Sequence, residues 1–70
     1  MVMVQLDYKK IRKLSDEKGW TLTELLNKAE VHHSTWYKIA QGFSVRRGTA
    51  LEFAYVLGVR LEDIGNVQKT

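Results

Sequence analysis

Three glycines limit the fold more than any other feature of the sequence, because each follows a segment of helical character. Gly19, Gly42 and Gly58 come directly after stretches in which apolar residues recur every three or four positions. Glycine often ends a helix because it adopts left-handed dihedrals at no steric cost. The sequence contains no proline. The glycine spacing therefore predicts an all-α fold, a compact bundle of four or five short helices, with a possible short strand at residues 2–6.

Capping residues indicate where the helices begin. Asp7 is expected to cap a first helix that reaches residue 18. Thr21 and Glu24 have the spacing of a capping box, in which the hydroxyl and the carboxylate each accept a backbone N–H. They predict a second helix that ends near residue 29. Further helices are expected at residues 33–41, 46–57 and 61–64.

Each predicted helix has an apolar stripe that is expected to face a common core. Trp36 and Ile39 lie on the same side of the third helix, so Trp36 is interpreted as a core anchor and not as a platform for stacking bases. In the fourth helix the expected stripe is Leu51, Ala54 and Leu57, with Ala50 and Phe53 beside it. Leu61 and Ile64 are expected to complete the core.

The composition excludes several ways of stabilising a small chain. The 70 residues include no cysteine, so neither disulfides nor a cysteine metal framework is available. Hydrophobic residues make up 44% and charged residues 27%, as in an ordinary folded domain. No apolar run approaches the roughly 20 residues of a membrane span. We expect one cytoplasmic domain over residues 1–70, with its core in residues 6–64, no cofactor and no contact with a membrane.

Positive charge is concentrated in the middle of the chain. The formal net charge is +3 at pH 7, and residues 31–51 contain no Asp or Glu. The same segment contains Lys38, Arg46 and Arg47 as well as two histidines. One interpretation is an ordinary solvated face. The other is a surface that binds phosphates, since a patch of one sign is typical of nucleic-acid-binding proteins.

Two short helices joined by a tight turn, with the second one basic and polar, are typical of a helix-turn-helix. The segment "WTLTELLNKAEVHHSTWYKIAQG" resembles the helix-turn-helix of the phage repressor and Cro family of bacterial regulators, also called the xenobiotic-response-element type. The segments "LDYKKIRKLSDEKGWT" and "TALEFAYVLGVRLEDI" resemble the helices before and after it. The resemblance covers residues 6–64 and places the helix-turn-helix at residues 21–41. It implies a lambda-repressor-like bundle whose third helix enters the DNA major groove.

The resemblance also implies which residues are buried and where this sequence departs from the family. Apolar residues occupy the five buried points of the motif, which are Leu25, Ala29, Val31, Trp36 and Ile39. Leu26 stands where the family usually has alanine, at the closest approach of the two helices. Glu30 stands where the family usually has a glycine with left-handed dihedrals, which a side chain makes costly.

By the same resemblance, His32 caps the third helix and the tip of that helix contacts bases. The expected base contacts are His32, His33, Ser34 and Tyr37. The expected phosphate contacts are Thr21, Thr23, Lys38, Ser44, Arg46 and Arg47. The two arginines are also an independent signal, because positive charge at the start of a helix opposes the helix dipole by roughly 0.3–1 kcal/mol each. The expected partner is a double-stranded DNA operator.

The residues leave other interpretations open. A metal site at His32 and His33 lacks an obvious third ligand, and adjacent helical residues point about 100° apart. A Ser–His–Asp hydrolase requires a preorganised pocket, for which this chain is small. The main rival is a protein-binding module, such as an antitoxin or antirepressor, that uses exposed Phe43, Phe53 and Tyr55. We expect a homodimer, formed through a strand edge at residues 2–6 or through residues 55–67.

Overall fold

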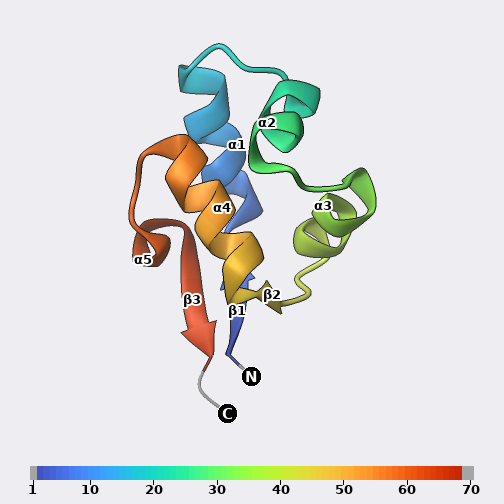
Figure 1. Cartoon of the computed structure of the whole chain (residues 1–70), viewed down its shortest axis with the longest axis vertical. Helices are drawn as coiled ribbons and strands as arrows, with labels where there is room; N and C mark the ends of the chain where they lie inside the picture. The colour runs from blue at the N-terminus through green and yellow to red at the C-terminus, as the bar shows by residue number, and fades with distance from the viewer. Residues whose placement is uncertain (1, 69–70) are drawn as a thin grey trace.

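The computed structural model describes residues 2–68, which form five helices and a three-stranded sheet (Figure 1). In Figure 1, α1 and α4 lie at the centre of the bundle, α2 and α3 on one side, α5 on the other, and the sheet at one end. The predicted helical bundle is confirmed, and the helix ends differ from the expected ones by at most one residue. The helices are α1 (Tyr8–Glu17), α2 (Leu22–Ala29), α3 (His33–Ala40), α4 (Arg47–Leu57) and α5 (Leu61–Ile64).

The predicted caps of the first two helices are present. The Asp7 side chain accepts a hydrogen bond from the backbone N–H of Lys10 at 3.2 Å. Thr21 and Glu24 form the full capping box, with both bonds at 3.2 Å. These bonds satisfy backbone groups that have no partner within their own helices, which explains why short-range patterns located both starts correctly.

The sheet has β1 (Met3–Leu6) at its centre, with β2 (Val45–Arg46) and β3 (Gly65–Gln68) antiparallel on either side. The strand predicted at residues 2–6 is confirmed, but the sequence did not predict β2 or β3. The expectation that residues 2–6 offer a free edge to a second copy is wrong. Met3 and Val4 pair with β2 on one side and with β3 on the other, so the hydrogen-bonding groups of both edges are already used there.

Where β3 begins, it lies very close to β1. A β-carbon added to Gly65 would lie 2.9 Å from side-chain carbons of both Val4 and Leu6 and 3.1 Å from the backbone oxygen of Gln5. The two carbon distances are shorter than those of real β-carbon contacts, and the oxygen distance is tighter than most. Gly65 therefore permits the chain to leave α5 and pair at once with β1.

The core lies between the helices and one face of the sheet. Trp36 is buried, as expected, and its ring centroid lies 6.0 Å from that of Phe53 and 6.4 Å from that of Tyr8. The stripe predicted for α4 is partly wrong, because Leu51 is 42% exposed whereas Ala50 and Phe53 are fully buried. The buried apolar residues are Val4, Leu6, Ile11, Leu25, Leu26, Ala29, Trp36, Ile39, Val45, Ala50, Phe53, Ala54, Leu57 and Ile64.

The turn between α2 and α3 places a side chain in the left-handed region. Glu30 has φ 56° and ψ 41°, and it is the one non-glycine residue with positive φ among those described. Glu30 therefore adopts the left-handed conformation that the family's usual glycine would have, although it carries a side chain. The turn is closed by the N–H of Val31, which donates to the carbonyl of Leu26 at 2.9 Å.

We expect Glu30→Gly to stabilise the fold by about 1 kcal/mol, because glycine removes the steric cost of the left-handed conformation and this gain exceeds the added entropy of the unfolded chain. Chemical denaturation of the two proteins measures the difference. Asn27→Gly, at an exposed right-handed position of α2, is the control and should be neutral or destabilising. An equal gain in both variants would contradict the assignment of strain to Glu30.

Candidate nucleic-acid interface

One face of α3 is fixed in the core, and this determines what the opposite face presents. Trp36 and Ile39 are buried, so the side chains about half a turn away point outward. His33, Ser34 and Lys38 are exposed, and Tyr37 is 60% exposed. The expected buried points of the motif are also confirmed, with Leu25 and Ala29 buried and Val31 partly buried. The helix-turn-helix therefore presents a polar helix face to solvent.

His32 is the N-cap of α3, as the resemblance implied. Its Nδ1 accepts a hydrogen bond from the backbone N–H of Ser34 at 3.2 Å, and it lies 3.0 Å from the Ser34 hydroxyl oxygen. Both side chains are exposed. The cap holds the imidazole and the hydroxyl together at the tip of the helix.

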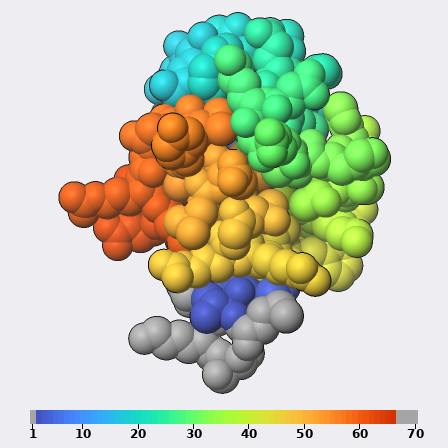
Figure 2. Space-filling view, in the orientation of Figure 1, coloured from blue at the N-terminus to red at the C-terminus, as the bar shows by residue number. Residues whose placement is uncertain are grey.

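The start of α4 adds positive charge close to α3 in the chain. Arg46 is the N-cap of α4 and Arg47 its first residue; both are exposed, and no side chain caps this helix. A four-residue loop connects α3 to β2, and the Gln5 side chain donates to the Gly42 carbonyl in that loop at 3.0 Å. Figure 2 shows α3, the loop and the start of α4 as a continuous green-to-yellow surface along one side and the lower edge of the molecule.

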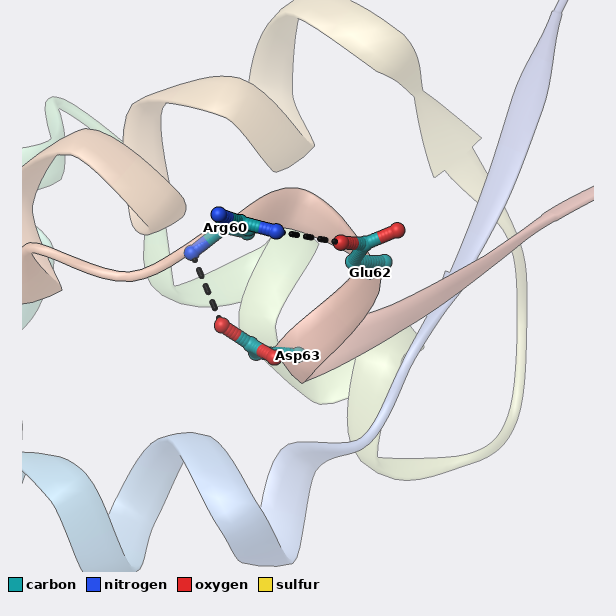
Figure 3. A network of polar contacts seen from close by, with 3 residues as sticks. All are labelled: Arg60, Glu62 and Asp63. Atoms are coloured by element: carbon teal, nitrogen blue, oxygen red, sulfur yellow. Dashed lines mark hydrogen bonds and ion pairs between the residues drawn. The ribbon is translucent and has the colours of Figure 1, made fainter.

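Two acidic side chains lie on α5, close to Arg60, the residue that caps the start of this helix. The Arg60 guanidinium lies 3.4 Å from a Glu62 carboxylate oxygen, and the Arg60 backbone N–H donates to Asp63 at 3.1 Å (Figure 3). An exposed ion pair of this kind contributes little to stability, but it neutralises Arg60 locally. In Figure 1, α5 lies on the opposite side of α4 from α3. The segment that contains α3 and the start of α4 has no Asp or Glu.

A model of the Cro/C1-type HTH DNA-binding domain matches residues 10–69. The chain belongs to this family. It is thus a DNA-binding transcription regulator, and DNA is its partner. Domains of the Cro/C1 type are typically not enzymes. No curated protein and no solved structure matched the chain.

The remaining predicted contacts of this Cro/C1-type domain lie at the start of α2 and before β2. Thr21 and Thr23 are exposed, and the Thr21 hydroxyl oxygen accepts the Glu24 N–H, which leaves its own hydrogen available to donate. Ser44 is partly buried. Gln41 was not predicted as a contact, although it is exposed at the end of α3, one turn after Tyr37 and Lys38. Its spacing of four residues from Tyr37 and three from Lys38, which places it on the same helix face, was the sequence signal that could have predicted this contact.

Two structural features bear on other classes of site in the Cro/C1-type domain. Among residues 2–68, no group of three or more His, Asp or Glu side chains is placed to hold a metal ion. Within the same residues, no helix has the length and apolar character needed to cross a bilayer.

Proposed function

We propose that the chain is a sequence-specific regulator of the Cro and repressor type that binds double-stranded DNA with α3 in the major groove. One observation carries the proposal. The face of α3 opposite the buried Trp36 is polar and exposed, and α3 lies in a segment that has no Asp or Glu but has two exposed arginines. The major groove, about 12 Å wide, admits one helix.

In this arrangement the tip of α3 contacts base edges and the surrounding elements contact the backbone. His33 donates to guanine, Ser34 pairs with a base edge, and Tyr37 contacts a thymine methyl or a phosphate. Lys38 and Ser44 bind phosphates beside α3, and Thr21 and Thr23 bind them at the start of α2. Arg46 and Arg47 bind a phosphate together with the backbone N–H groups at the start of α4, where no side chain caps the helix.

A homodimer would give this domain two half-sites about 34 Å apart, one turn of the double helix. The free strand edges belong to β2 and β3 and not to β1, since no other segment among residues 2–68 pairs with the outer side of either strand, and β3 is the longer of the two. Unprotected edges readily pair with another chain. We therefore propose that the dimer contact involves β3 and Tyr55 of α4, whose side chain is 85% exposed.

Replacing Arg46 with alanine tests the phosphate contact. We expect Arg46→Ala to weaken binding to all duplex sequences alike and to reduce the slope of log Kd against log salt by about one. Fluorescence anisotropy at several salt concentrations measures both effects. Arg60→Ala is the matched control, because Arg60 is paired with Glu62 on α5, and its slope should equal that of the original protein. A changed sequence preference with an unchanged slope would rule out the phosphate contact at Arg46.

A second candidate function is a protein-binding module built on the same fold. Two exposed aromatic side chains favour it: Phe43, 58% exposed after α3, and Tyr55 on α4. Phe53 does not belong to this surface, because it is fully buried. The salt dependence of binding distinguishes the two functions, because affinity for DNA falls steeply with rising salt and affinity at an apolar protein interface does not.

A further inference from the structure

The cap at the tip of α3 fixes the tautomer of His32. The ring Nδ1 lies 3.2 Å from the backbone nitrogen of Ser34. A backbone N–H only donates, so the Nδ1 atom that accepts this bond carries a lone pair and no hydrogen. A neutral imidazole has one ring hydrogen. That hydrogen is therefore on Nε2, and among residues 2–68 no protein group is bonded to this atom.

The same contact fixes the direction of the Ser34 hydroxyl. Its oxygen lies 3.0 Å from Nδ1 of His32. Because Nδ1 has no hydrogen to give, this contact is a hydrogen bond only when the serine O–H donates to the ring. The backbone N–H and the hydroxyl of Ser34 then share the one lone pair of Nδ1. The serine oxygen keeps only lone pairs for any other partner, although an isolated hydroxyl both donates and accepts.

We propose that His32 and Ser34 read DNA with fixed polarity, His32 as a donor through Nε2–H and Ser34 as an acceptor through its hydroxyl oxygen. This rests on the proposed function, in which the tip of α3 faces base edges. The major-groove edges of guanine and thymine offer no hydrogen-bond donor, whereas adenine N6 and cytosine N4 each offer an amino group. The base that faces Ser34 is therefore adenine or cytosine, and the group that faces His32 is an acceptor.

The tautomer is tested first, on the full chain without DNA. Nitrogen-15 NMR of the histidine rings at pH 8 should show the hydrogen of His32 on Nε2. His32→Asp should keep α3 capped, because an aspartate oxygen is a good N-cap acceptor, and the ionised carboxylate has no hydrogen to donate. A ring that carries its hydrogen on Nδ1 would overturn the inference and leave the proposed function intact.

The polarity is then tested on the duplex that the full chain selects from a random library. Removing the exocyclic amino group from the base that faces Ser34 should weaken binding about two- to twelve-fold, the worth of one hydrogen bond. The same change in the DNA should not alter binding by the Ser34→Ala variant. Removing the acceptor that faces His32 should likewise weaken binding by the original protein but not by the His32→Asp variant.

Two results would count against this polarity. Suppose that removing a base carbonyl oxygen or ring nitrogen, and not an amino group, weakens binding by the original protein but not by the Ser34→Ala variant. The assignment of Ser34 as an acceptor is then wrong. If the chain binds no duplex at all, the proposed function fails and the reading by His32 and Ser34 fails with it, whatever the NMR shows.

Discussion

Replacing Phe53 with alanine should lower the free energy of unfolding by about 3–5 kcal/mol, the usual cost of removing a buried aromatic ring. Phe53 is fully buried and its ring lies 6.0 Å from that of Trp36, so it connects α4 to α3. A core of this size rarely supplies more than roughly 3–5 kcal/mol. Phe53→Ala should therefore be largely unfolded at room temperature, as measured by circular dichroism in a urea titration.

Tyr55→Ala is the matched control for this prediction. Tyr55 is an aromatic residue of the same helix, only two positions away, but it is 85% exposed. Its replacement should change the free energy of unfolding by less than about 0.5 kcal/mol. Similar losses in both variants would show that the packing assigned to α4 is wrong.

Replacing Ser34 and Tyr37 together with alanine should abolish most of the sequence preference. A good base contact contributes about 1–3 kcal/mol of discrimination against the wrong base, and both side chains lie on the exposed face of α3. Affinity for random duplex DNA should change little, since the expected phosphate contacts remain. Competition between the selected duplex and random DNA measures the ratio of the two affinities.

Asn27→Ala is the control for the double substitution, because Asn27 is an exposed polar residue of α2 outside the expected contacts. It should retain the full preference. A double variant that still prefers the selected duplex would place base reading outside the tip of α3.

Local signals in the sequence predicted the helix starts well because the groups that form a cap are three residues apart. Asp7 and the Thr21–Glu24 pair show this directly. The resemblance to the phage repressor and Cro family predicted the position of the turn and the role of His32 as the cap of the third helix. The stripe of α4 was harder to predict, because apolar residues occupy several of its faces. Leu51 and Phe53 are both apolar, and only packing against the other helices shows that Phe53 is the buried one.

The sheet and the polarity of the α3 tip required the three-dimensional structure. β2 has two residues, too few for an alternating pattern, and it pairs with a strand about 40 positions earlier in the chain. The bonding state of His32 depends on the distances from its Nδ1 to two Ser34 atoms, which residue types do not specify. The sequence predicted which residues form the candidate contact surface but not which of them donate and which accept.

The central claim is that Lys38, Arg46 and Arg47, the lysine and arginines of the acid-free segment that contains α3, neutralise phosphates of duplex DNA. A salt titration of binding by the full chain tests this most directly. If Lys38, Arg46 and Arg47 each neutralise one phosphate, the logarithm of the association constant falls against the logarithm of salt with a slope of about −3. Steep, linear weakening is the result we predict. Absence of binding at about 50 mM salt, or binding that salt does not weaken, would contradict it.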